Sequence, residues 1–254
     1  MKDKLSKLYL YLIFAFLYLP IIILIIFSFN ESKYRTWTGF SLKWYVQLFE
    51  DSQIMAALQN TLIVAFSAAI ISTIIGTIAA IGIDSLKKWQ KSIVMNINYL
   101  PVLNPDIVTG VSLMLLFFFL KIPMGRITLI LAHMTFCIPY VILAVLPKLR
   151  QMNKHTFEAA LDLGATPALA TFKVIIPEIA PGIVTGFLMA LTLSIDDFII
   201  SFFTTGPGVE NLSILIYNAA KKGVSPSINA LSALMFVVIL SLLLIINKRT
   251  AKNN

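Results

Sequence analysis

Six long, almost uncharged apolar runs are the feature that most limits how this chain can fold. Each is about as long as the ~20 helical residues that cross the hydrocarbon core of a bilayer. The runs are continuously apolar and do not alternate as barrel strands do, so they predict helices. We expect them at about 8–29, 58–83, 93–120, 127–146, 182–203 and 228–247. Pro101 and Pro105 interrupt the third run and can break its helix.

The composition supports the same class of protein. Hydrophobic residues make up 58% of the 254 residues and charged residues only 13%. A soluble domain of this length would have too few charges to cover its surface. A single cysteine, Cys137, excludes a disulfide framework, and the apolar content excludes disordered and fibrous classes. The sequence therefore predicts an all-α polytopic membrane protein, with one transmembrane domain over residues 1–254.

The positive charge fits a membrane better than a nucleic acid. The net charge is +8, but the basic residues form short clusters between the apolar runs rather than one stripe. With six spans, 13 of the 20 lysines and arginines fall on the side that holds both termini. The positive-inside bias then predicts a multi-pass protein of the cell membrane with both termini in the cytoplasm.

The loop at about 150–180, between the fourth and fifth runs, contains signals for two short helices. Thr156 can cap the first helix, and Gly164 can end it in a left-handed conformation. Thr166 followed by Pro167 is a typical start for the second helix. The charge bias places this loop in the cytoplasm.

The spacing within this loop resembles the EAA loop of ABC importer permeases. That motif reads Glu-Ala-Ala, three residues, Gly, nine residues and Ile-x-Leu-Pro. The matching residues here are Glu158, Ala159, Ala160, Gly164, Val174, Ile176 and Pro177. The resemblance implies a type I importer permease of the MetI-like fold, whose loop is a coupling helix that docks on a separate ATPase.

No phosphate-binding loop of the G-x-x-x-x-G-K-[ST] type occurs in the chain. The chain therefore cannot be the subunit that hydrolyses the nucleotide. We expect a transport subunit that is not an enzyme and binds no cofactor or metal, with ATP and Mg²⁺ held by the partner ATPase. His133 and Cys137 are one helical turn apart, but two potential ligands do not make a metal site.

Three carboxylates, Asp106, Asp196 and Asp197, fall inside the predicted spans without a Lys or Arg in any span core. Each costs about 2.5–3.5 kcal/mol at a helix centre, and such groups usually mark a pathway or a buried partner. On a helix, Asp197 would align with Ser194 and Ser201, about 100° from Asp196. One acid can then face a pore and the other a partner helix. Unpaired acid in the path predicts a cationic cargo.

Asp106 has an alternative interpretation. Asn104 as a cap, Pro105 at the first helical position and Asp106 at the second would make a good helix start. A helix broken there would lie near the middle of the bilayer, where broken helices line cavities. Both interpretations stay open on the sequence alone.

Nearly the whole chain resembles the spermidine/putrescine permeases of the PotC type. The resemblance rests on short segments at 18–24, 28–30, 43–45, 105–108, 135–137, 193–197 and 223–226. It implies a second, homologous permease, a dimer of ABC ATPases at the 150–180 loop and an extracytoplasmic polyamine-binding protein. It also implies an outer gate, for which the matching positions are Trp44, Tyr217 and Lys221.

Two other functions stay open. One is an importer permease for a different small substrate, and the other is a secondary transporter driven by ions. A membrane-embedded enzyme is a third alternative, which the lack of a catalytic motif disfavours. The small residues Ser72, Gly76 and Ala80, and likewise Gly182 and Gly186, recur at helical spacing and predict close helix packing.

Overall fold

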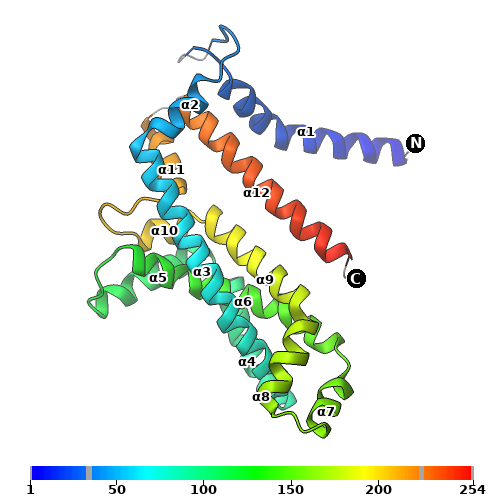
Figure 1. Ribbon diagram of the computed structural model, residues 1–254. Coiled ribbons are helices and arrows are strands. Elements are labelled where there is room, and N and C mark those ends of the chain that lie inside the picture. The colour runs from blue at the N-terminus through cyan, green and yellow to red at the C-terminus, as the bar shows by residue number, and fades with distance from the viewer. Residues whose placement is uncertain (1, 33–35, 223–225, 253–254) are drawn as a thin grey trace.

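The computed structural model describes residues 2–32, 36–222 and 226–252, and within these ranges the protein is built from helices. The helices are α1 (Lys2–Ser28), α2 (Lys43–Glu50), α3 (Ser52–Ser85), α4 (Lys88–Leu103), α5 (Asp106–Phe119), α6 (Arg126–Gln151), α7 (Lys154–Asp162), α8 (Pro167–Ala170), a π-helical turn (Thr171–Ile175), α9 (Ile176–Asp196), α10 (Ile199–Thr204), α11 (Leu212–Lys222) and α12 (Pro226–Lys252). Figure 1 shows α7 and α8 at one end of the molecule and α2 and α11 at the other.

Within the described ranges, five helices or helical stretches are long and apolar enough to cross a membrane, and α4 and α5 together form a sixth candidate. The expectation of an all-α chain with membrane-spanning helices is confirmed. The third run bends by 102° between α4 and α5, at Asn104 and Pro105, whereas Pro101 lies inside α4 and does not interrupt it. The fifth run differs from the sequence-based expectation, because α9 starts at Ile176 and ends at Asp196, and a separate helix, α10, follows.

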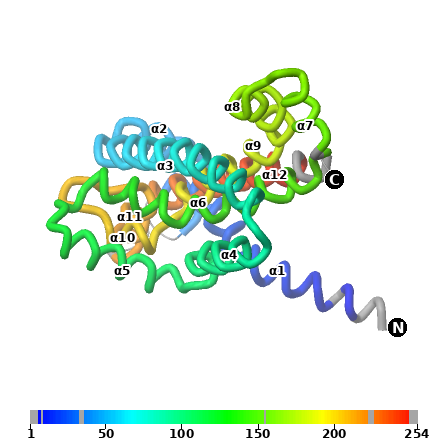
Figure 2. The backbone as a smooth tube through the Cα atoms, turned by 90° about the horizontal axis from the view of Figure 1, so that it is seen from below, coloured from blue at the N-terminus to red at the C-terminus, as the bar shows by residue number. Residues whose placement is uncertain are grey.

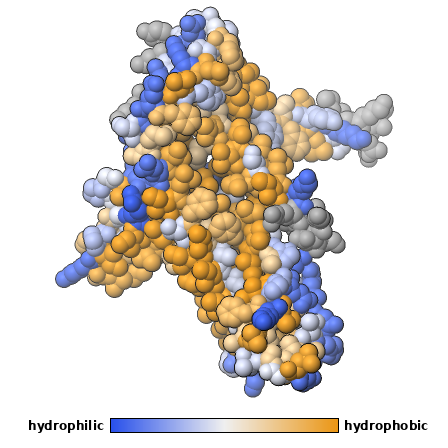
Figure 3. All heavy atoms as spheres, in the orientation of Figure 1, coloured by the Kyte–Doolittle hydropathy of each residue, from blue (hydrophilic) through white to orange (hydrophobic). Residues whose placement is uncertain are grey.

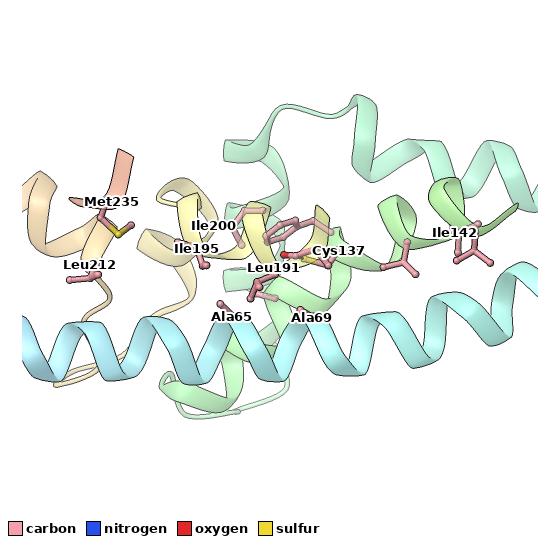
Figure 4. Packing of buried hydrophobic residues seen from close by; sticks show 14 of the residues in the cluster. Ala65, Ala69, Cys137, Ile142, Leu191, Ile195, Ile200, Leu212 and Met235 are labelled. Atoms are coloured by element: carbon pink, nitrogen blue, oxygen red, sulfur yellow. Dashed lines mark hydrogen bonds between the residues drawn. The ribbon is translucent and has the colours of Figure 1, made fainter. Parts of the chain in front are cut away.

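The core lies where α3, α6 and α9 pack together. Small residues allow this close approach, as predicted from their spacing. A methyl group on Gly76 of α3 would lie 2.7 Å from Cγ1 of Val141 in α6, and one on Gly186 of α9 would lie 3.2 Å from the Cα atom of Val141. Figure 4 shows the apolar side chains, among them Ala65, Ala69 and Leu191, between these helices.

The first helix, α1, leaves the bundle and packs against α12 (Figures 1 and 2). The most apolar stretch of α1 is not buried within the chain, although Ser28 at the end of the helix is. Much of the remaining surface is also apolar, and Figure 3 shows hydrophobic residues over most of the face in view, with hydrophilic residues near α7 and at the opposite end. An apolar surface of this extent fits lipid or other membrane subunits rather than water.

Candidate functional site

The first element of the site is the break between α4 and α5. Asn104 and Pro105 are extended there, and α5 begins at Asp106. Pro105 has no N–H to donate and disfavours helical geometry at Asn104. The predicted interruption is therefore present, but the cap differs from the expectation, because Asn104 forms no capping bond and Asp106 is the first helical residue.

The second element is a break between α9 and α10 that the sequence did not predict. Asp197 is extended and Phe198 leads into α10. The carboxylate of Asp197 accepts hydrogen bonds from the backbone N–H groups of Ile200 (3.2 Å) and Ser201 (2.7 Å). Asp197 therefore caps α10, and the expected continuous helix through residue 203 is wrong.

A cavity of about 550 Å³ lies between the two breaks, and Asp106, Asp196 and Asp197 all line it. The other walls come from α4, α6, α9, α10 and α12, with aromatic surface from Phe136 and Tyr140. None of the residues that line it, in the part of the chain described, is Lys, Arg or His. The fold thus brings Asp106 next to the adjacent pair Asp196 and Asp197, which lies 90 residues later in the sequence, and no basic side chain is among the described lining residues.

The three acids have different surroundings. Asp106 and Asp196 are exposed in the isolated chain, and their carboxylates form no hydrogen bond or ion pair with the described residues. Asp106 lies at the favourable N-terminal end of α5, whereas Asp196 lies at the C-terminal end of α9, where the helix dipole already supplies negative potential. A cation near Asp196 would therefore relieve an unfavourable arrangement.

Asp197 differs because its side chain is only 9% exposed. Besides capping α10, its Oδ2 atom lies 3.5 Å from Nε2 of His133, a buried residue of α6. The sequence pairs His133 only with Cys137, as two potential metal ligands that do not make a site, and does not indicate its contact with Asp197. Among the described residues no group of three or more potential metal ligands occurs.

The three residues suggested for an outer gate separate into two places. The ring of Tyr217 lies 4.4 Å from that of Phe198, which lines the cavity, and the Lys221 ammonium lies 4.2 Å from the Tyr217 ring. Trp44 does not line the cavity. Its indole is buried and donates a 2.7 Å hydrogen bond to the backbone oxygen of Asn30, which ties α2 to the end of α1.

Two further cavities adjoin the acid-lined one. One of about 490 Å³ shares Tyr140 with it and extends along α6 and α9 to Lys148 and Gln151, toward the α7–α8 end. The other, of about 410 Å³, shares Asp196 and Phe198 and is lined by α11 and α12. Tyr140 and Phe198 are therefore site residues that the sequence did not single out, because aromatic residues are frequent in membrane helices.

The α7–α8 end has the two-helix form that the sequence predicts. Gly164 has a φ of 88°, and the Ala165 and Gly164 N–H groups bond to the carbonyls of Ala160 (3.1 Å) and Leu161 (2.9 Å). This Schellman arrangement closes α7. Thr166 caps α8 through its hydroxyl, as expected.

One detail of this loop is corrected. Asn153, not Thr156, caps α7, because its side-chain oxygen accepts a 3.0 Å hydrogen bond from the His155 N–H. Both residue types are good caps, so residue type alone did not locate the helix start.

The surface around the loop motif is exposed and largely apolar. Glu158, Ala159 and Pro177 are exposed, and a cavity of about 340 Å³ between α7 and α8 is lined by Ala160 and Gly164. Leu163 is 89% exposed and Phe172 is 70% exposed beside it. Large apolar side chains with this exposure at one end of a molecule indicate a surface that another protein covers.

The fold, the internal cavity and the exposed apolar α7–α8 end are those of a polytopic membrane permease. The family model for binding-protein-dependent transport system inner membrane components matches residues 72–249. The chain belongs to this family. It is therefore the membrane permease of an ABC importer and not an enzyme, and a partner ATPase binds the nucleotide.

Curated relatives cover most of the chain. The spermidine/putrescine transport system permease protein PotC of Haemophilus influenzae is 38% identical over 89% of this chain and 89% of its own length. The putrescine transport system permease protein PotI of Escherichia coli is 41% identical over 82% of this chain and 77% of its own length. The predicted resemblance to this group of permeases is confirmed.

The fold also matches a solved importer. A crystal structure of a bacterial ABC transporter for alginate contains a chain with a TM-score of 0.70 and 19% identity, covering 99% of this chain and 96% of that one. At this identity the likeness supports the fold alone. The family assignment sets aside the ion-driven secondary transporter, and it implies an ATPase and a binding protein as partners.

Proposed function

We propose that this chain moves spermidine or putrescine inward across the cell membrane, as one permease of a polyamine importer. The observation that carries the proposal is the cavity at the two helix breaks, which is lined by three carboxylates and, among the residues that the structure describes, by no basic one. Polyamines are flexible cations with several charges, so separated carboxylates offset their lost hydration. The names of the relatives PotC and PotI support the same cargo.

Within the cavity, Asp106 and Asp196 are the proposed contacts for the cargo, and Asp197 supports them from behind. Asp106 and Asp196 carry unpaired carboxylates at the ends of two different helices. Tyr140 lines both this cavity and the one that extends toward α7, which makes its ring a suitable cation–π surface along the route. Tyr217 packs against Phe198, which lines the cavity, and Lys221 lies over the Tyr217 ring. The lysine would repel a cation there unless an acid of a partner faces it.

The α7–α8 end is the proposed contact with an ABC ATPase dimer, through Glu158, Ala159, Ala160, Gly164 and Pro177. The exposed Leu163 and Phe172 give it an apolar surface to bury. This assignment puts the α7–α8 end and both termini in the cytoplasm. A second, homologous permease would cover the exposed α1 and the open side of the cavity, and a polyamine-binding protein would deliver cargo at the α2–α11 end.

Uptake by the reconstituted importer tests the cargo. We expect spermidine or putrescine to be transported and to compete with each other, while thiamine and an alginate oligosaccharide do not compete. Asp106→Asn and Asp196→Asn should each lower uptake at least about tenfold with assembly unchanged. The control is Asp84→Asn, an acid near the end of α3 that lies outside the cavity and pairs with Lys91 at a partly exposed site. Normal polyamine uptake by both cavity variants would refute the proposed role of these acids.

Co-purification of the ATPase tests the docking end. Glu158→Ala combined with Leu163→Asp should release the ATPase, because the pair removes the motif acid and places a charge on the apolar surface. Glu50→Gln, an exposed acid at the end of α2, serves as the control at the opposite end of the molecule. Retention of the ATPase by the double variant would place the contact elsewhere.

A further inference from the structure

The break between α9 and α10 contains no proline or glycine, so side-chain contacts hold it: the Asp197 cap within the break and a residue of another helix. His133 of α6 is fully buried and lies across the break. Its Nδ1 atom is 2.5 Å from Oγ of Ser194 in α9, and its Nε2 atom is 2.9 Å from Oγ of Ser201 in α10. One imidazole ring therefore connects the two helices on either side of the break.

The hydrogen bonds around this ring form a closed network. Ser201 Oγ also accepts a 2.8 Å hydrogen bond from the Asn211 amide at the start of α11. The Asp197 carboxylate accepts from the Ser201 N–H and lies 3.5 Å from Nε2 of His133. A carboxylate only accepts, so this geometry favours a proton on Nε2, with Nδ1 accepting from Ser194. Each ring nitrogen thus has a partner, and the network joins α6, α9, α10 and α11.

The network decides where the two neighbouring acids point. Asp197 is held toward α6 and the start of α10, while Asp196 ends α9 and lines both the 550 Å³ cavity and the 410 Å³ cavity. Residues 198–203 are apolar apart from Ser201 and would otherwise extend α9, since a continuous helix satisfies its own backbone in a membrane. An extended helix would remove the negative C-terminal end of α9 from the cavity.

We propose that His133 is a positioning residue that clamps the α9–α10 break and thereby creates the negative potential at Asp196. His133 itself carries no negative charge. Without it, however, the Asp196 carboxylate and the C-terminal end of α9 no longer face the cavity together. This inference deepens the proposed function, because the potential is what would attract a polyamine. The potential itself can be measured without any polyamine.

Modification of a cavity cysteine by charged reagents tests the clamp. Ile199→Cys, which lines the cavity, is placed in a Cys137→Ala background that removes the native cysteine. The purified importer in detergent is treated with a cationic and an anionic methanethiosulfonate, and the ratio of the two rates reports the local potential. We expect Asp196→Asn to lower the ratio about tenfold and His133→Leu to lower it as much, although the latter removes no negative charge.

Two matched variants separate the clamp from a general loss of packing. Leu129→Ala, one turn earlier on α6 and equally buried, lies outside the network and should leave the ratio unchanged. His133→Gln keeps a donor toward Ser201 and should restore at least part of the ratio. If His133→Leu does not assemble, Ser194→Ala with Ser201→Ala removes the ring's partners instead and should give the same fall.

The outcomes are distinguishable. A ratio that stays at the wild-type value in assembled His133→Leu, or in the double serine variant, overturns the clamp. A ratio that falls equally in Leu129→Ala also overturns it, because the effect is then one of packing. If the ratio falls as expected but the wild-type importer transports no polyamine, the clamp stands and the proposed cargo fails.

Discussion

The two helix breaks that frame the cavity are held by different means. Between α4 and α5 the chain itself forbids a helix, because Pro105 removes a donor and restricts Asn104. Between α9 and α10 no residue forbids a helix, and the break is held by His133 and by the Asp197 cap. The first, local break is encoded in adjacent residues alone, whereas the second, non-local break also depends on His133, which lies on another helix.

This difference predicts at which of the two breaks a substitution has the larger effect. The helices that follow the two breaks, α5 and α10, pack side by side (Figure 1). Loss of the non-local break would therefore also disturb the local one through α10. Substitutions at the α9–α10 break should consequently have larger effects than those at the α4–α5 break.

The largest effect is expected from the two neighbouring acids of the non-local break. Asp197→Ala removes the α10 cap and leaves buried groups unpaired, which we expect to destabilise the assembled importer by about 2–3 kcal/mol. Asp196→Ala breaks no hydrogen bond and removes a negative charge from the C-terminal end of α9, where the helix dipole disfavours it. The thermal stability should therefore stay unchanged or rise slightly. Thermal unfolding of both variants and their polyamine uptake check this pair.

Uptake should fall in both variants, but for different reasons. Equal loss of stability in Asp196→Ala and Asp197→Ala would contradict the different surroundings described for the two acids. Unchanged stability in Asp197→Ala would mean that the α9–α10 break does not depend on its cap.

The next effect concerns the contact between the helices that follow the breaks. A methyl group on Gly110 of α5 would lie 3.1 Å from Cδ2 of Phe203 and 3.4 Å from the Cα atom of Ile200, both in α10. We expect Gly110→Ala to destabilise by about 1 kcal/mol, since overpacking exceeds the gain in helix propensity. The control is Gly82→Ala, which meets nothing within 4 Å and should be neutral or stabilising. If Gly110→Ala leaves the thermal stability unchanged or raises it, as Gly82→Ala should, then α5 and α10 are not closely packed at this glycine.

The contrast between local and non-local causes also explains how far the sequence could be interpreted. The apolar runs, the proline break and the glycine turn at Gly164 depend on residue type and spacing within a few positions, and they were predicted. The sequence also suggested that Asp197 shares a face with Ser194 and Ser201. It did not show that His133, 61 residues before Ser194, completes this group, because no local pattern relates α6 to α9.

A smaller effect is expected at the third interruption, between α7 and α8, where backbone conformation alone decides. Gly164 has a φ of 88°, and a methyl group added to it would meet nothing within 4 Å, so packing plays no part. Gly164→Ala should weaken the turn by about 1 kcal/mol, whereas Gly164→Asn should be better tolerated. Transport-coupled ATPase activity of the two variants checks this. Equal activity of Ala and Asn variants would mean that the left-handed turn is not needed for coupling.

The smallest effect is expected from Pro105→Ala, although proline is the evident cause of the local break. Proline forbids a helix at Asn104, but its removal only permits one, and α5 stays held against α10 at Gly110. Spin labels at the exposed positions 97 and 119 would be about 33 Å apart along a straight helix and closer across the 102° bend. We expect Pro105→Ala to keep the distance distribution of the unsubstituted protein. A shift toward the straight-helix distance would mean that the proline alone maintains this wall of the cavity, and that packing on α10 contributes little to it.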